Sequence, residues 1–385
     1  MMKLKKILFP CISILVGLLL SIILLEMICR VLPVRDSLKT LSVDAENPVM
    51  RFKENRDVIW SSGADFSIIT KKHVNNYGFL NDQNYSSADK SPLLAIIGDS
   101  FVEAAQVENK NAMHGLLSRD SVGRGRIYGF GASGSPLSTY LVYANYAVKA
   151  FHATELVFIV VGNDFDESLV KYKNAPGFHY FSGEGDDLVL VRKDFHSSFI
   201  KRLSRQSSLV RYLALNMGLN WQSIENIFVN DTDEAMVKFV GNTRADFDEE
   251  RISDSRRAVD KFFKELPLQT GLKNDKILFV LDGMRPQLYD PITRRKANGS
   301  YFDLMRKYFM KFAVKKGYEV VDMQPIFIEK HESEGTRFEF PTDGHWNEIG
   351  HNLVAEKIKG SAVYNTFLLT KWKPTVPTFT LMDGH

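Results

Sequence analysis

Short apolar runs, rich in β-branched residues, alternate along this chain with segments whose apolar residues are three or four positions apart. The runs predict buried strands, because a strand covered on both faces is apolar throughout. They lie at 93–98, 126–131, 155–161, 276–281 and 318–322. The helical spacing is clearest in three segments between or after the runs, at 136–151, 300–316 and 347–359.

This alternation predicts an α/β fold: a three-layer αβα sandwich around a mainly parallel, flavodoxin-like five-stranded sheet. We expect the αβα domain to span residues 91–360. A polar, irregular stalk at 31–90 would precede it and dock on it, and a tail at 361–385 would follow. Right-handed crossovers bring the carboxyl ends of the strands to one edge of the sheet, which is where open α/β sheets bind ligands.

The alternation is interrupted at about 165–245, which we interpret as an insertion at the carboxyl edge of the sheet. Within it, residues 178–181 and 188–192 flank a glycine-rich turn and predict a hairpin. A helical pattern follows near 199–217.

The N-terminus carries an uncharged apolar run at 7–25, about as long as a helix that crosses a bilayer. Lys3, Lys5 and Lys6 precede this run, which favours a cytoplasmic tail and export of the rest of the chain. The run is long for a cleaved signal peptide and has no good small-residue cleavage site after it. We therefore expect residues 1–30 to be a cytoplasmic tail and an uncleaved, single-pass signal anchor in the cell membrane, with the αβα domain extracytoplasmic, in the periplasm or outside the cell. A cleaved signal peptide is the alternative.

The composition is that of an ordinary globular protein, with 385 residues, 44% hydrophobic and 25% charged, and a formal net charge of +3. It has no long basic run, so nucleic acid is not an expected partner. Cys11 and Cys29 are the only cysteines. On one helix they are about 27 Å apart and cannot form a disulfide. Histidines and carboxylates with metal-site spacing are absent from the sequence, so we expect no metal and no cofactor. The oligomeric state stays open.

A serine follows the first apolar run through the sharp turn Gly98-Asp99-Ser100. A helix that begins just after Ser100 would direct free N–H groups and the positive end of its dipole to this point, and both stabilise an oxyanion. The alternative is that Asp99 and Ser100 only cap that helix.

Three further segments add candidate chemistry at the same predicted edge. Gly134, in the turn after the second run, lets a backbone N–H approach a substrate closely. Asn163, after the third run, offers amide donors. Asp343 and His345 precede the last helix, and residues two apart in an extended segment face the same side, so Asp343 could hold the imidazole. A tight turn or a helix cap is the structural alternative for Gly134 and for Asn163.

The order Ser100, Gly134, Asn163, His345 resembles the four blocks of the SGNH (GDSL-type) hydrolase superfamily, over roughly residues 93–360. The resemblance implies a serine esterase in which Ser100 is the nucleophile, His345 the base and Asp343 its partner. It also implies an oxyanion hole made by the backbone N–H groups of Ser100 and Gly134 and the side chain of Asn163. The stretch 75–79 and the anchor resemble those of membrane-anchored bacterial members near polysaccharide assembly, which implies an acylated glycan as substrate.

The chain departs from the superfamily pattern in each of three blocks. Ala105 stands where the first block usually has glycine, and Val161 stands at the first position of the third block. The last block is Asp343-x-His345 rather than Asp-x-x-His, and with the following Trp346 it is similar to the alginate O-acetyltransferase-like branch. Ester hydrolysis, transfer of an acyl group to an exported polysaccharide, and a non-catalytic role in glycan assembly therefore all stay open.

Two other features are weighed against simpler interpretations. Arg285 follows the fourth run and could grip a carboxylate or phosphate of the substrate, or it could be a solvated loop residue. Asp383-Gly384-His385 repeats the late tripeptide at the C-terminus. No helical pattern follows it, and we expect it to be frayed and uninvolved.

Overall fold

The computed structural model describes residues 2–185, 187–197, 205–219, 248–285 and 288–370. Its strands are β1 (Arg56–Ser62), β2 (Ile68–Val74), β3 (Leu93–Gly98), β4 (Arg126–Gly131), β5 (Glu155–Val160), β6 (His179–Ser182), β7 (Val189–Arg192), β8 (Ile277–Leu281), β9 (Glu319–Asp322), β10 (Glu339–Phe340) and β11 (Asp343–Trp346). Its longer helices are α1 (Met2–Val31), α3 (Met113–Asp120), α4 (Leu137–Phe151), α8 (Glu249–Thr270), α10 (Tyr301–Lys315), α11 (Met323–Glu334), α12 (Glu348–Lys359) and α13 (Ala362–Leu369). Short helical turns are α2 (Ser100–Glu103), η1 (Asn109–Asn111), η2 (Asp166–Ser168), α6 (Ser208–Arg211), η3 (Tyr212–Asn216), η4 (Asn274–Lys276) and α9 (Pro291–Ala297).

Five parallel strands form the central sheet in the order β4-β3-β5-β8-β9. This is the flavodoxin-like order that the alternating pattern predicts, and the predicted α/β class is confirmed. The strands β3, β4, β5 and β8 are buried along their whole length, whereas the edge strand β9 is only half-buried. The chain first passes from β3 to β4 on one side of β3 and then crosses to β5 on its other side. The topological switch point therefore lies at the carboxyl ends of β3 and β5.

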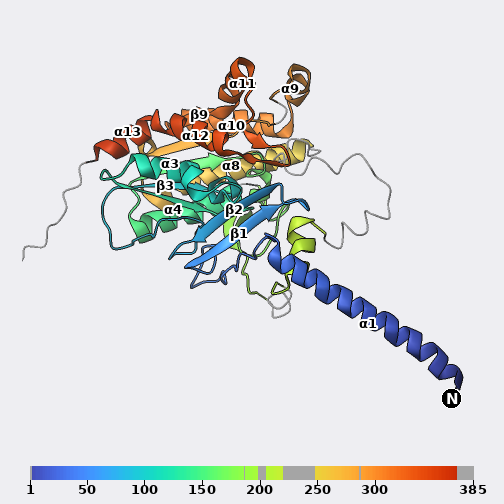
Figure 1. Cartoon of the computed structure of the whole chain (residues 1–385). Coiled ribbons are helices and arrows are strands. Elements are labelled where there is room, and N and C mark those ends of the chain that lie inside the picture. Colours follow the sequence, from blue (N-terminus) through green and yellow to red (C-terminus); the bar gives the residue numbers. More distant parts are fainter. Residues whose placement is uncertain (1, 186, 198–204, 220–247, 286–287, 371–385) are drawn as a thin grey trace, which may run out of the picture.

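Helices cover both faces of the sheet (Figure 1). The crossover helices α4, α8 and α10 pack in sequence on one face, and α3, α11, α12 and α13 pack on the other. Each helix turns an apolar stripe to the sheet; in α8 the stripe includes Val259, Phe262, Phe263 and Leu266, all buried. The main hydrophobic cluster therefore runs through both layers, and a small second cluster comprises Ala104, Val107 and Ala112.

The expectation of an irregular stalk at 31–90 is wrong in one respect, because residues 56–74 form an antiparallel hairpin of β1 and β2. Buried residues on both strands, among them Val58, Trp60, Ile68 and Val74, join the main hydrophobic cluster. The alternation of buried and exposed residues in β2 includes a lysine at a buried position, which hides the strand pattern in the sequence.

This lysine, Lys72, reaches from the hairpin into the segment after Ser100. Its ammonium group donates hydrogen bonds to the carbonyl oxygens of Ala104 (2.9 Å) and Val107 (2.8 Å), and Thr70 bonds the carbonyl of Ala105 (2.6 Å). Ala104 has a φ of 50°, a left-handed conformation that costs an alanine about 1–2 kcal/mol. The hairpin thus holds the chain behind Ser100 in this turn.

We expect the free energy of unfolding of the wild type, relative to that of Lys72→Met, to rise by about 2 kcal/mol from about pH 7 to about pH 9. Burial lowers the pKa of Lys72 from 10.5 to about 7. Between these values the unfolded chain binds more protons than the folded chain, so stability rises with pH. The neutral amine keeps two N–H donors for its two carbonyls. Chemical denaturation at both pH values measures the difference, and parallel pH profiles for the two proteins would contradict it.

The hairpin predicted within the insertion is confirmed, because β6 and β7 pair as antiparallel strands. Of the helical pattern near 199–217, the described part contains α6 and a π-helical turn, η3, while residues 198–204 lie outside the described residues. The tail expected after 361 begins with a helix, α13, rather than with irregular chain. In the N-terminal helix, Phe9–Val31 is apolar enough for a membrane span or a signal sequence, with a mean hydropathy of 2.7.

Candidate active site

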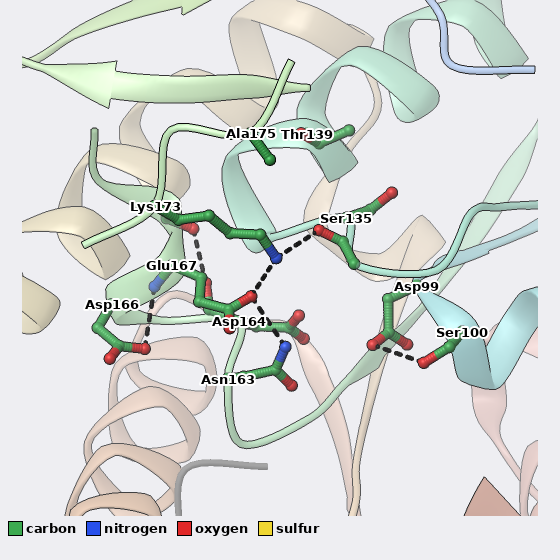
Figure 2. Close-up of polar contacts among 12 residues, drawn as sticks. Asp99, Ser100, Ser135, Thr139, Asn163, Asp164, Asp166, Glu167, Lys173 and Ala175 are labelled. Carbon is green, nitrogen blue, oxygen red and sulfur yellow. Dashed lines mark hydrogen bonds and ion pairs between the residues drawn. The ribbon is translucent and has the colours of Figure 1, made fainter. Parts of the chain in front are cut away.

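Ser100 is the first residue of α2, directly after the carboxyl end of β3, the second strand of the sheet. Asp99 caps this short helix, since its carboxylate accepts a hydrogen bond from the backbone N–H of Phe101 (3.0 Å). The Ser100 hydroxyl oxygen also lies 3.2 Å from the Asp99 carboxylate (Figure 2). Both interpretations of the Gly-Asp-Ser turn therefore hold together: Asp99 is the cap, and Ser100 stands at the edge of the sheet where ligands bind.

His345 joins Ser100 from the far end of the sequence. Its Nε2 atom lies 2.8 Å from the Ser100 hydroxyl oxygen. Its Nδ1 atom is hydrogen-bonded to the Asp343 carboxylate, which also accepts the backbone N–H of His345 over 2.9 Å. Both residues lie on β11, whose extended backbone turns their side chains to the same side. The structure thus brings the serine, the imidazole and the carboxylate into one chain of contacts.

The Asp343 carboxylate is mostly buried and stays ionised. Burial alone would raise the pKa of Asp343, but the hydrogen bonds and charge of His345 outweigh it and hold that pKa below its usual range. Gln106, in the turn that Lys72 braces, donates its amide N–H to the second carboxylate oxygen over 3.3 Å. A fixed, ionised carboxylate at Nδ1 keeps the Nε2 atom available as a proton acceptor facing Ser100.

Arg285 contacts the backbone of the strand that carries Asp343 and His345. Its side chain is buried, pairs with Asp282 (2.5 Å) and donates to the carbonyl oxygen of Gly344 (3.0 Å). Asp282 also accepts the indole N–H of Trp346 over 2.9 Å. These contacts fix the residues on both sides of His345, Gly344 and Trp346. Arg285 is therefore not a solvated loop residue. Its contacts favour positioning of His345 over binding of a substrate anion.

We expect Arg285→Met to lower the free energy of unfolding by about 3–5 kcal/mol, because Asp282 would be left buried without its ion-pair partner. It should lower kcat for ester hydrolysis while changing KM less than about threefold, since it acts through Gly344. Chemical denaturation and steady-state kinetics measure both effects. Arg337→Met, which removes an exposed arginine near Glu339, is the matched control. A large rise in KM with unchanged kcat would instead indicate a grip on substrate.

Gly134 and Asn163 stand after the strands on either side of β3, and a polar network links them. The Asn163 amide nitrogen donates to Glu167 over 3.0 Å, and Glu167 is ion-paired with Lys173. The Lys173 ammonium donates to the Gly134 carbonyl over 2.8 Å. An amide nitrogen has two N–H groups, so one can stay with Glu167 while the other is offered to a substrate. Gly134 has a φ of 82°, which suits glycine.

Buried carboxyl groups surround the base of the site. Burial raises the pKa of Asp99 to about 6. Burial, followed by the charge of Asp99, raises the pKa of Asp164 well above its usual range. Asp164 accepts the hydroxyl of Tyr140 (2.9 Å) and the backbone N–H of Val161 (2.7 Å). It therefore fixes the start of the loop that carries Asn163.

Several residues at the site escape prediction from the sequence. Asp282 has a detectable signal, because it follows a buried strand as Asp99 does. Gln106 and Lys173 lie in loops and Glu167 in the short turn η2, and none of these segments has a sequence pattern that marks the residue. Asp383 and His385, of the repeated C-terminal tripeptide, lie outside the described residues. Within the described part of the chain, no group of three or more His, Cys, Asp and Glu side chains is arranged to hold a metal ion.

Comparison with known proteins finds similar structures at low sequence identity. No protein-family model and no curated protein matches the chain. A member of the lipolytic protein G-D-S-L family from Veillonella parvula is 12% identical, with 70% of this chain and 97% of that chain covered and a TM-score of 0.37. The acetyl xylan esterase AlAXEase is 13% identical, covering 70% and 98%, with a TM-score of 0.37. A lipase/acylhydrolase from Enterococcus faecalis is 12% identical, covering 70% and 96%, with a TM-score of 0.34. Since all three TM-scores are below 0.5, the chemistry of this site has to follow from its own geometry.

Proposed function

We propose that this protein is a membrane-anchored serine esterase of the SGNH type, which removes acyl groups, foremost O-acetyl groups, from an extracytoplasmic glycan. One observation carries the proposal: the hydroxyl oxygen of Ser100 lies 2.8 Å from Nε2 of His345, whose other nitrogen is bonded to Asp343. A nucleophile, a base and an orienting carboxylate in this order are the parts of acyl transfer through a covalent intermediate.

In the first step His345 takes the proton of the Ser100 hydroxyl while the oxygen attacks the ester carbonyl. Asp343 holds the imidazole in the required tautomer and stabilises the cation that forms. The imidazolium then gives the proton to the departing alcohol, which leaves an acyl group on Ser100. In the second step His345 deprotonates water, which attacks the acyl group and releases the carboxylic acid and free Ser100.

The negative charge on the carbonyl oxygen needs donors at a fixed place. The backbone N–H groups of Ser100 and Gly134 and the amide of Asn163 are our candidates. Each such donor is typically worth about 10²–10³ in kcat. The bond from Asn163 to Glu167 supports this role, because it fixes the orientation of the amide before substrate arrives.

The location and the substrate class rest on features outside the active site. The apolar helix Phe9–Val31 and the lysines before it support an anchor with the catalytic domain outside the cytoplasm. The resemblance of residues 75–79 and of the anchor to membrane-anchored members near polysaccharide assembly motivates a glycan as the acyl carrier.

A second function uses the same residues with a sugar hydroxyl in place of water. The specific observation in its favour is the Asp343-x-His345-Trp346 block, which is similar to the O-acetyltransferase-like branch. Transfer requires that water be kept from the acyl-enzyme until the sugar hydroxyl is in place.

The two functions differ in where the acyl group ends. The full chain in detergent is given an aryl acetate, with and without a deacetylated bacterial polysaccharide, and free acetate and glycan-bound acetate are quantified by mass spectrometry. An esterase yields free acetate with or without the glycan, and releases acetate from an acetylated glycan. A transferase acetylates the glycan in amounts that follow aryl release. No turnover of any ester would contradict both functions and favour the non-catalytic assembly role.

A further inference from the structure

A second candidate site lies near the end of the N-terminal helix, and none of the active-site residues described above lines it. It is a cavity of about 610 Å³ whose charged lining comprises Asp36, Lys39, Lys53, Arg56, Arg205 and Arg211. Among the described residues that line it, Asp36 is the sole carboxylate, and it is ion-paired with Arg211 over 2.5 Å. Among the described lining residues, positive charge therefore exceeds negative charge.

The backbone holds two of these cations side by side. The N–H of Lys53 donates to the carbonyl of Lys39 over 2.7 Å, and the two lysines lie next to the antiparallel bridge between Thr40 and Phe52. Both lysine side chains are exposed. Like charges on adjacent backbone segments repel each other, so this pair of lysines costs free energy unless an anion binds close to both of them.

The cavity wall is joined directly to the apolar helix α1. The carboxylate of Glu26, inside the candidate span Phe9–Val31, accepts hydrogen bonds from the Ser207 hydroxyl (2.7 Å) and from the backbone N–H groups of Ser208 (3.1 Å) and Leu209 (2.9 Å). It thereby caps α6, the short helix that carries Arg211. Figure 1 shows α6 in yellow-green beside the end of α1. Arg205 and Arg211 therefore lie at the level where α1 ends.

The same helical segment leaves apolar side chains uncovered. Val210, Leu213 and Met217 follow one another at intervals of three and four residues, about one helical turn, and are 41%, 37% and 42% exposed. An apolar side next to a cluster of Arg and Lys is typical of helices that lie in the interface of a membrane. The cations beside it are then at the depth of the lipid head groups.

We propose that this cavity binds the phosphate of an anionic phospholipid head group and so docks the catalytic domain on the surface of the membrane that holds α1. Guanidinium and ammonium groups are the natural donors to phosphate oxygens, Arg205 as a planar fork and Lys39 and Lys53 as mobile point charges, while Arg211 stays paired with Asp36. The inference goes beyond the proposed esterase activity, and it depends on the membrane anchor that belongs to that proposal.

The test measures lipid retention rather than catalysis. The full chain in a mild detergent is incubated with phosphatidylglycerol, phosphatidylcholine or inorganic phosphate, and bound molecules are counted by native mass spectrometry. We expect phosphatidylglycerol to be retained in preference to phosphatidylcholine, and equimolar inorganic phosphate not to displace it. The Lys39→Gln/Lys53→Gln double variant should bind phosphatidylglycerol roughly tenfold more weakly.

The matched control is Lys315→Gln/Lys357→Gln, which removes two exposed lysines from α10 and α12, on the side of the domain away from α1 in Figure 1. It should retain the lipid like the wild type, and so should Ser100→Ala, whether or not the protein is an esterase. Equal retention of the two lipids, full retention by Lys39→Gln/Lys53→Gln, or displacement by equimolar phosphate would each overturn the proposal.

Discussion

Replacing Ser100 by alanine is expected to reduce kcat for hydrolysis of an aryl acetate by about 10⁴–10⁶. The substitution removes the oxygen that would carry the acyl group, while the side chain of His345 stays bonded to Asp343. The residual rate would come from the oxyanion donors and from water. KM should change little, because the hydroxyl contributes to the transition state more than to binding of the ester.

A matched serine separates this effect from a loss of structure. Ser333 is exposed on α11, and its hydroxyl bonds only carbonyl groups of its own helix, those of Glu329 and Lys330, in the described structure. Ser333→Ala should keep the wild-type kcat. If Ser100→Ala retained more than about a tenth of the wild-type kcat, Ser100 could not be the nucleophile.

The second large effect is expected for Asp343→Asn, with a loss of about 10⁴ in kcat. The carboxylate accepts both the backbone N–H and the Nδ1–H of His345. An amide that presents its NH₂ group to Nδ1 stabilises the other tautomer, in which Nε2 carries the proton and cannot accept one from Ser100. The negative charge that stabilises the imidazolium is lost as well.

The pH dependence and a neighbouring substitution sharpen this test. Because the pKa of Asp343 is held below its usual range, the carboxylate stays ionised at neutral pH and is protonated only as the pH falls below the usual aspartate range. Gln106→Met removes only the 3.3 Å bond to the second carboxylate oxygen, and we expect a loss of less than about tenfold in kcat. Equal losses for Gln106→Met and Asp343→Asn would contradict the role given to the charge of Asp343.

Much of the fold is predictable because its strands are buried on both faces. The runs predicted at 93–98 and 126–131 are β3 and β4 to the residue. The hairpin β1–β2 escaped prediction because Lys72 occupies a buried position and breaks the apolar alternation. The helix α8 was not predicted, although Asp248 caps it and its apolar residues recur with helical spacing. It begins just after a long segment without a regular pattern, which obscures its start.

The candidate site is predictable where one strand or turn fixes the side chain, and not where distant loops meet. The contact of Asp343 with His345 follows from two residues of one extended segment. The role of Arg285 does not, since only the folded chain brings its guanidinium to the Gly344 carbonyl. Asn163 contacts Glu167 of the short turn η2, which pairs with Lys173 of the following loop; these sequences carry no period, and no local pattern could have linked the three residues.

The most direct test of the proposed mechanism is covalent labelling of the purified full chain with a fluorophosphonate, followed by peptide mass spectrometry. Such a reagent reacts with a serine whose proton a neighbouring base removes. The predicted result is one adduct per chain on Ser100, absent from Ser100→Ala and formed far more slowly by His345→Gln. Labelling at another residue, or hydrolysis of an aryl acetate that continues undiminished after full labelling of Ser100, would contradict it.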